Sequence, residues 1–181
     1  MCAGSCGPGD LHLINGLFDC HRNRVPVLAI AAQIPSHEIG SGYFQETHPE
    51  HLFKDCSYYC ELVSQPEQMP RVLGIALRTA LTKRGVAVVV IPGDVALREC
   101  AAPALSLGID NSASFLFPSD VELRSAAQIL NSARKVTILG GAGCESAHAE
   151  LIAVAERLKA PIVHALRARN LSSTTTLLTW G

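Results

Sequence analysis

The stretch VAVVVIPGD, residues 86–94, is an unbroken apolar run that ends in a Gly-Asp pair. Such a run is typical of a strand that is buried on both faces of a parallel sheet. A second run, VPVLAIAA at residues 25–32, is bounded by polar residues and by Pro35. Both runs are far shorter than the ~20 apolar residues of a membrane-spanning helix. The two stretches therefore predict buried strands of a parallel sheet.

Segments with helical periodicity accompany these strands. After the Gly7-Pro8-Gly9 turn, where Pro8 suits the start of a helix, apolar residues recur at helical spacing at Leu11, Ile14, Leu17 and Phe18. A second helix is expected through residues 72–81, and Ser64 with Glu67 forms a capping box before it. Strands that alternate with helices indicate an α/β fold.

A second α/β unit is expected after a change in composition near residue 96. Residues 96–118 keep no period and are rich in Ala, Ser and Pro, which is typical of a linker on the surface. Ser119 and Glu122 form another capping box. A strand, a helix and a strand are then expected at KVTILGG, at residues 145–159 and at PIVHAL.

The predicted fold is therefore α/β, with three-layer units built on parallel sheets. The first unit covers residues 1–95, the linker residues 96–118 and the second unit residues 119–181. The apolar lead-in to the Gly-Pro-Gly turn is only a few residues long, as it would be if a strand had been trimmed. We expect both units to be incomplete and the chain to be an internal piece of a larger enzyme.

Composition excludes several classes of partner. The chain has 181 residues, a formal net charge of −1 and a sequence pI of about 6.6, so no global field attracts nucleic acid or an anionic membrane. No signal peptide precedes the apolar runs, and we expect a cytoplasmic location. The seven cysteines leave open a zinc site that combines two pairs at four-residue spacing with nearby histidines: Cys2, Cys6, Cys56, Cys60, His48 and His51. We favour reduced cysteines that serve as small core residues, and predict no metal site.

An ordered series of motifs resembles one enzyme family. GPG at residues 7–9 is followed by QIP, by IGSGYFQE and by IPGDV, and the likeness resumes with ILGGAGCESAHAEL and APIVHALR. This series resembles the thiamine-diphosphate enzymes, and within them the flavin-dependent pyruvate oxidases, also called pyruvate dehydrogenases (quinone). The resemblance implies that residues 1–95 are part of the pyrimidine-binding domain, and that residues 119–181 begin the central, FAD-binding domain.

The resemblance also implies an activity and a set of site residues. The family's flavin-dependent members decarboxylate pyruvate to acetate and carbon dioxide with thiamine diphosphate, Mg²⁺ and FAD, and pass electrons to quinone. Phe44 and Gln45 would be catalytic, and would reach a neighbouring active site of a homo-oligomer. The implied cofactor-binding residues are Gly7, Pro8, Gly9 and Gln33 for thiamine diphosphate, and Gly141, Gly143, His164 and Arg167 for FAD. The glycine loop, residues 140–143 (GGAG), follows a predicted strand. It is expected to open a helix, whose N-terminus could hold a phosphate.

Departures from the family are equally informative. No acidic residue matches the glutamate that protonates the aminopyrimidine, and no stretch matches the Gly-Asp-Gly…Asn motif for Mg²⁺ and diphosphate. We therefore expect this chain alone to be inactive, and expect membrane contact in the parent enzyme only through a missing C-terminal segment. Residues 171–181, LSSTTTLLTWG, break the family pattern, and we interpret them as out-of-frame translation.

Three alternatives stay open beside the pyruvate oxidase. Acetolactate synthase shares the GPG and FQE motifs. A non-catalytic nucleotide-binding module would use the glycine loop alone. The chain could also be a subunit that interacts with a full-length oxidase.

Overall fold

The computed structural model describes residues 1–100, 117–165 and 167–168. The chain divides into two compact units, Met1–Ser114 and Phe115–Gly181. The domain boundaries expected at residues 95 and 119 stay predictions. The segment from about residue 171, which we interpreted as out of frame, lies outside the described residues, as does most of the expected linker.

The first unit is built on a four-stranded parallel sheet with the order β1-β2-β4-β3. Its strands are β1 (Cys2–Gly4), β2 (Val27–Gln33), β3 (Tyr59–Leu62) and β4 (Val86–Pro92). β2 and β4 pair along their whole length, from Val27 opposite Val86 to Gln33 opposite Pro92. The two apolar runs therefore form the central strands, and the predicted α/β class with parallel sheets is confirmed.

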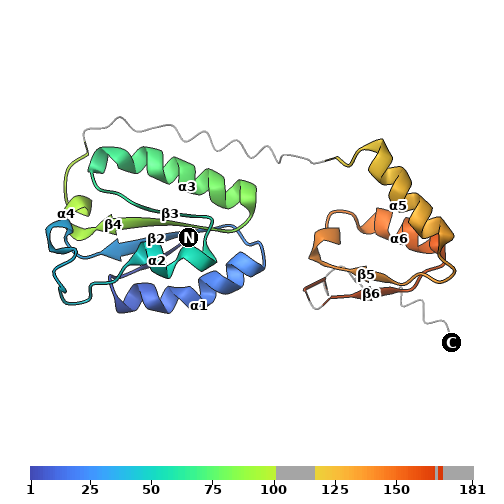
Figure 1. Ribbon diagram of the computed structural model, residues 1–181, viewed down its shortest axis with the longest axis horizontal. Helices are drawn as coiled ribbons and strands as arrows, with labels where there is room; N and C mark the ends of the chain where they lie inside the picture. Colours follow the sequence, from blue (N-terminus) through green and yellow to red (C-terminus); the bar gives the residue numbers. More distant parts are fainter. Residues whose placement is uncertain (101–116, 166, 169–181) are drawn as a thin grey trace. The chain divides into compact units, whose positions relative to one another are not determined.

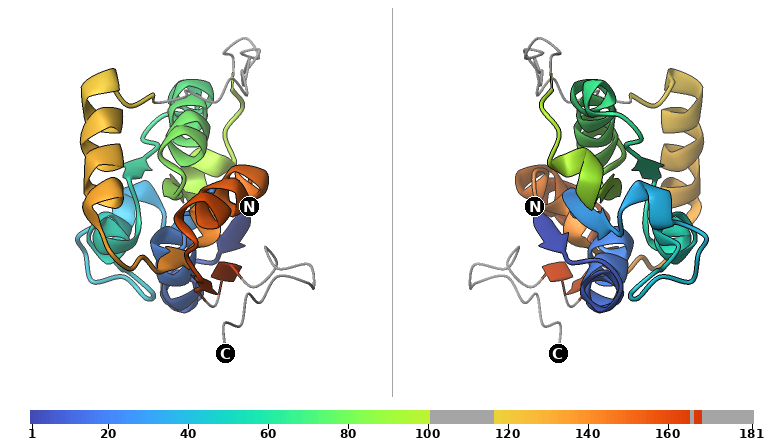
Figure 2. Two further views of the ribbon diagram at one scale, coloured as in Figure 1. Left: turned by 90° about the vertical axis from the view of Figure 1, so that its right-hand side faces the viewer. Right: turned by 90° about the vertical axis from the view of Figure 1, so that its left-hand side faces the viewer.

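Helices cover both faces of this sheet. Helix α1 (Pro8–Arg22) and helix α3 (Met69–Lys83) lie on opposite sides, as Figure 1 and the end-on views of Figure 2 show. The side chains of β4 alternate between two cores. Val86, Val88 and Val90 pack on the α1 side, whereas Ala87 and Val89 pack on the α3 side. Because both faces are buried, β4 contains only apolar residues, and each buried valine contributes about 1.5–3 kcal/mol.

Short helical segments complete the first unit. They are η1 (Ser36–Glu38), α2 (Pro49–Leu52), η2 (Lys54–Cys56), η3 (Pro66–Gln68) and α4 (Gly93–Ala96). The buried thiol of Cys56 belongs to the α1-side core, in keeping with a core role for this cysteine.

The capping box predicted at Ser64 and Glu67 is wrong. The side chain of Gln68 accepts hydrogen bonds from the backbone N–H groups of Ser64, at 2.9 Å, and Gln65, at 3.3 Å. The box lies one residue later because the 3₁₀ turn η3 intervenes, so α3 begins only at Met69.

The second unit contains helix α5 (Asp120–Ser132), strand β5 (Ile138–Gly140), turn η4 (Ala142–Cys144), helix α6 (His148–Leu158) and strand β6 (Ile162–His164). The two strands pair in parallel, and α6 packs on them through Leu151, whose Cδ2 approaches Gly140. The capping box of Ser119 and Glu122 is confirmed: the Ser119 N–H donates to Glu122 Oε2 at 2.8 Å. Both strands are shorter than their apolar runs predict.

The second unit exposes much apolar surface. No residue of α5 is buried, and Val121 and Ile129 of this helix are 75% and 67% exposed. On the strands, Leu139 and Val163 are 73% and 54% exposed. Within its described residues this unit therefore buries only part of its apolar face.

Candidate functional site

The residues predicted to bind thiamine diphosphate follow the carboxyl ends of parallel strands. The Gly7-Pro8-Gly9 turn follows β1, residues 34–47 follow β2, and Asp94 follows β4. We call residues 34–47 the FQE loop, because they contain Phe44, Gln45 and Glu46. In open α/β sheets ligands bind at the carboxyl edge, so the fold brings these segments to the expected place.

The Gly-Pro-Gly turn contacts the tip of the FQE loop directly. Gly7 has a φ of +68°, and a Cβ atom added there would lie 2.8 Å from the backbone oxygen of Gln45. The Cys6 thiol donates to the side-chain Oε1 of the same glutamine at 3.6 Å. Cys6 and Gln45 lie 39 residues apart in the chain, so the fold brings two distant motifs together at the carboxyl edge.

Contacts within the chain explain the glycines of this turn. At Gly7, both the positive φ and the Gln45 backbone exclude a side chain. At Gly9, an added Cβ would collide with the Ser5 hydroxyl. Pro8 occupies the first turn of α1, where its missing N–H group removes no helical hydrogen bond. The approach of these residues to a cofactor stays a prediction.

The two residues predicted to be catalytic lie at the exposed tip of the FQE loop. Phe44 is 81% exposed, and Gln45 adopts a φ of +66°, which is rare for a residue with a side chain. The Oε1 atom of Gln45 accepts from Cys6, while its Nε2 group has no hydrogen-bond partner in the described part of the chain. The tip therefore presents an aromatic ring and an amide donor.

Glu46 organises the backbone around this tip. Its carboxylate accepts hydrogen bonds from the N–H groups of Gly40 at 2.5 Å, Gly42 at 2.8 Å and Tyr43 at 3.2 Å. These bonds hold the pKa of Glu46 below its ordinary value, with the Gly40 N–H as the largest cause. The sequence places Glu46 within a family motif but gives no sign of this role.

Gln33 uses its side-chain amide at the base of the FQE loop. The side chain is buried; its Oε1 accepts from the Ile34 N–H at 2.9 Å, and its Nε2 donates to the Thr47 carbonyl at 2.8 Å. The amide therefore joins the first residues of the loop to the last. The predicted proximity of Gln33 to a cofactor stays a prediction.

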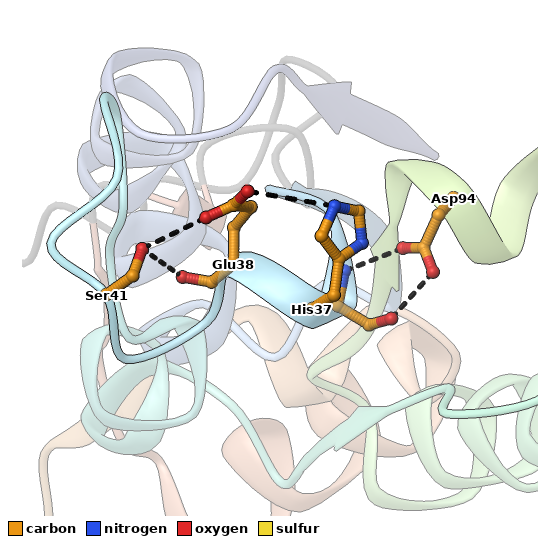
Figure 3. A network of polar contacts seen from close by, with 5 residues as sticks. His37, Glu38, Ser41 and Asp94 are labelled. Atoms are coloured by element: carbon orange, nitrogen blue, oxygen red, sulfur yellow. Dashed lines mark hydrogen bonds and ion pairs between the residues drawn. The ribbon is translucent and has the colours of Figure 1, made fainter.

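Asp94 anchors the start of the FQE loop from the end of β4. Its carboxylate accepts from the Ser36 N–H at 2.7 Å and from the Ser36 hydroxyl at 2.6 Å. Figure 3 shows this carboxylate beside the start of η1, and shows Glu38 paired with Ser41 further along the loop. The hydrogen bonds from Ser36 hold the pKa of Asp94 below its ordinary value.

Asp10, in the first turn of α1, is a buried carboxyl group that the sequence pattern does not single out. The side chain is 0% exposed, and neither carboxylate oxygen has a hydrogen-bond partner among the described residues. Desolvation raises the pKa of Asp10 to about 7. An aspartate in a first helical turn is ordinarily a solvated residue that favours the helix dipole, so the sequence carries no signal of this burial.

The residues predicted to bind FAD form a separate group in the second unit. Gly140 pairs with His164 across β5 and β6, and the Ala165 N–H donates to the Gly140 carbonyl at 2.8 Å. Gly141 and exposed His164 therefore lie at the carboxyl edge of this sheet, and Arg167 follows as an exposed residue.

The glycine loop does not open a helix, contrary to the sequence prediction. Gly141 and Gly143 belong to the segment around η4, where the Cys144 N–H donates to the Gly141 carbonyl at 3.0 Å. Helix α6 begins only at His148, because the 3₁₀ turn separates it from the strand. An added Cβ at Gly141 or Gly143 would meet no atom within 4 Å, so packing does not require glycine there.

The described residues contain neither a metal cluster nor a membrane span. Within residues 1–100, 117–165 and 167–168, no three His, Cys, Asp or Glu side chains are grouped so that they could hold a metal ion. None of the helices in this part of the chain has the length and hydrophobicity needed to cross a bilayer.

Comparison with protein families identifies the chain. Residues 1–52 match the N-terminal TPP binding domain of thiamine pyrophosphate enzymes, and residues 123–181 match the central domain of the same enzymes. Thiamine pyrophosphate is another name for thiamine diphosphate. The chain therefore belongs to the thiamine pyrophosphate enzyme family. The central-domain match runs to residue 181, so it includes the segment from about residue 171 that we expected to depart from the family.

Individual relatives span several activities. The chain is 64% identical over 166 residues to an uncharacterized 42.6 kDa protein in the isoamylase 3′ region of Pseudomonas amyloderamosa, covering 91% of this chain and 42% of that protein. It is 31% identical to the pyruvate oxidase of Lactiplantibacillus plantarum, covering 94% and 29%. It is also 31% identical to the acetolactate synthase isozyme 2 large subunit of Escherichia coli, covering 82% and 27%. The chain thus spans less than half the length of these relatives.

Proposed function

We propose that this chain forms one side of a thiamine diphosphate site in an enzyme that decarboxylates pyruvate oxidatively, in the manner of a pyruvate oxidase. The observation that carries the proposal is the contact between Gly7 and Gln45, which joins the Gly-Pro-Gly turn to the FQE loop at the carboxyl edge of the sheet. A turn without side chains and a loop that presents polar and aromatic groups together suit the wall of a cofactor pocket.

The residues of the first unit fit this cofactor. The Gln45 amide keeps a donor that no described residue uses, and the Phe44 ring is available for apolar contact. Thiamine diphosphate, when bound, supplies the nucleophile for the keto carbon and accepts the electrons left by loss of carbon dioxide. The Gln45 Nε2 group would donate to the carboxylate or keto oxygen of pyruvate. The Phe44 ring would exclude water, which favours loss of a carboxylate as neutral carbon dioxide.

The Cys6 thiol orients the Gln45 amide for that role. Because the thiol donates to Oε1, the Nε2 group, which no described residue accepts from, is available to a ligand. The Cys6 thiol and the Gln45 amide both stay neutral while the substrate binds. Their contribution is therefore to orient the Gln45 Nε2 group and to donate its hydrogen bond.

The described residues of the second unit support FAD binding less well than those of the first unit support thiamine diphosphate binding. Gly141 and Gly143 have open space around them, and no helix N-terminus follows them directly. The described residues of this unit therefore do not fit a built pyrophosphate cradle, and we derive no step through FAD. Electron transfer to FAD and quinone, Mg²⁺ binding and a homo-oligomeric parent enzyme enter the proposal only through the similarity to pyruvate oxidase.

Acetolactate synthase is the second candidate, because the identity to the Escherichia coli enzyme equals that to the pyruvate oxidase. The two activities share the loss of carbon dioxide from pyruvate and differ in their final products. An assay of pyruvate turnover for acetate with quinone reduction, and for acetolactate, separates them. We expect neither product from this chain alone, because no stretch of its sequence matches the diphosphate-binding motif.

The test of the proposal is an NMR titration of the ¹⁵N-labelled chain with thiamine diphosphate and Mg²⁺. We expect amide shifts at Gly7, Gly9, Phe44 and Gln45. Gln45→Ala should weaken the response, whereas Gln128→Ala, at an exposed glutamine of α5, should not. An identical titration of wild type and Gln45→Ala would contradict the assigned role. Shifts with FAD or ADP at Gly141 and Gly143 alone would favour the nucleotide-binding module instead.

A further inference from the structure

Side-chain hydrogen bonds hold the FQE loop at its base, its start and its tip, in addition to those of Ser41 with Glu38 and of Cys6 with Gln45. The loop's only regular element is the single turn η1, and its other backbone hydrogen bonds are isolated turn bonds, from the Ser41 N–H to the Glu38 carbonyl and from the Glu46 N–H to the Tyr43 carbonyl. Ordering such a segment costs about 1–2 kcal/mol per residue in backbone entropy. Beside the backbone bond from the Glu46 N–H to the Tyr43 carbonyl, side chains that bond the loop backbone are therefore candidates for the groups that keep its tip in place.

The base of the loop is closed by Gln33. One amide group bonds Ile34 through its oxygen and Thr47 through its nitrogen, so the two ends of the loop are bridged by a single buried side chain. Burial strengthens this bridge, because water does not compete for the amide.

The start of the loop is anchored from outside by Asp94. Both carboxylate oxygens accept from Ser36, one from its backbone and one from its hydroxyl. Since Asp94 lies on α4 after the central strand β4, the anchor connects the loop to the rigid part of the sheet.

The tip of the loop is closed on itself by Glu46. Its two oxygens accept from three backbone N–H groups of the preceding residues, those of Gly40, Gly42 and Tyr43. Gly40 and Gly42 have φ values of +91° and +74°, which turn their N–H groups inward at no steric cost. The carboxylate thus fixes the backbone on the N-terminal side of Phe44 and Gln45, and it is itself the next residue after them.

We propose that Glu46 is a positioning residue, whose carboxylate holds the tip of the FQE loop in the conformation that presents Phe44 and Gln45, with Gln33 and Asp94 fixing the loop's base. The importance of that position for turnover rests on the proposed function. The conformational role does not, because it concerns the chain without any ligand.

The first test is a pH titration of the ¹⁵N-labelled full chain followed by NMR. Neighbouring groups that carry or acquire charge are His48, which faces Glu46, and His37 and Glu38 in the same loop. The amides of Gly40, Gly42 and Tyr43 should titrate together, with a midpoint below the ordinary pKa of glutamate. In Glu46→Gln this shared titration should disappear. Its persistence in the variant, or three unrelated midpoints in the wild type, would overturn the proposal.

The second test is cleavage by chymotrypsin under native conditions. Tyr43 and Phe44 are exposed cleavage sites at the loop tip. Cleavage there requires local opening, so Glu46→Ala should be cut about tenfold faster than wild type, and Glu46→Gln, which keeps one acceptor oxygen, less so. The matched control is Glu38→Ala, because among the described residues that carboxylate contacts only the side chains of Ser41 and His37.

The control should be cleaved at nearly the wild-type rate, within about twofold. Equal cleavage of the Glu46→Ala and Glu38→Ala variants would refute the role of Glu46, provided that both keep the wild-type far-UV circular dichroism. Both tests use the chain without ligand. If Glu46→Ala opens the loop as expected but thiamine diphosphate causes no shifts, the role of Glu46 therefore stands and the proposed function is rejected.

Discussion

Replacing Asp10 by asparagine should stabilise the first unit at high pH and do much less at low pH. Asp10 is fully buried without a hydrogen-bond partner among the described residues, and desolvation raises its pKa from 3.8 to about 7. The folded state therefore binds the Asp10 proton more tightly than the unfolded state does. Stability associated with this group is highest below pH 4, falls as pH rises from about 4 to 7, and is constant above that.

The size of the effect is set by the two pKa values. Each pH unit between them corresponds to about 1.4 kcal/mol, so ionised Asp10 destabilises the fold by about 4 kcal/mol at pH 8. At pH 5 most of this penalty is absent, and the linkage relation leaves about 1.5–2 kcal/mol. The asparagine side chain of the variant is neutral at every pH, and its unpartnered amide adds a cost that does not depend on pH.

The assay is urea unfolding of the wild type and Asp10→Asn between pH 5 and pH 8. The free energy of unfolding of the variant minus that of the wild type should rise by about 2–3 kcal/mol across this range. Asp94→Asn is the control. The lowered pKa of Asp94 keeps it ionised throughout, so its difference from the wild type should be constant. A pH-independent difference for Asp10→Asn would refute the reasoning.

Three glycine-to-alanine substitutions test how the conformation and the surroundings of each glycine affect the free energy of unfolding. Gly7→Ala should lower the free energy of unfolding by at least about 1 kcal/mol, because φ is +68° and the added methyl group meets the FQE loop. Gly141→Ala, with open space around it, should change it by less than about 0.5 kcal/mol. Gly16→Ala, in the exposed interior of α1 with no atom within 4 Å, should raise it by about 0.5–1 kcal/mol. Urea unfolding measures all three, and a stabilising Gly7→Ala or a destabilising Gly16→Ala would contradict this account.

The local elements of the fold were accessible from the sequence because their signals are local. Unbroken apolar runs identified β2 and β4, since only a strand covered on both faces needs no polar residue. The Ser119 and Glu122 spacing identified the start of α5, because both partners of a capping box lie within one turn. The error at Ser64 is also instructive: Ser64 and Glu67 match the capping-box pattern better than Gln65 and Gln68 do, but the turn η3 that begins at Pro66 forms the box with Gln65 and Gln68 instead.

The motifs of the family were also accessible, because they are short and ordered along the chain. They predicted that Gly7, Phe44 and Gln45 belong to one cofactor site; the structure brings Gly7 against the Gln45 backbone, and the approach of these residues to a cofactor stays a prediction. In the second unit the prediction from the glycine pattern was wrong. It placed the start of a helix where the chain forms the 3₁₀ turn η4. Four residues of glycine and alanine have too weak a preference to distinguish the two.

Only the tertiary structure decided how the candidate site is held together. The contact of Gly7 with Gln45 and the anchor of Ser36 on Asp94 join residues that are distant in the chain. Their partners depend on which strands lie side by side, and a β1-β2-β4-β3 order cannot be inferred from the composition of any single strand. The burial of Asp10 has the same cause, since nothing local distinguishes it from a solvated aspartate in a first helical turn.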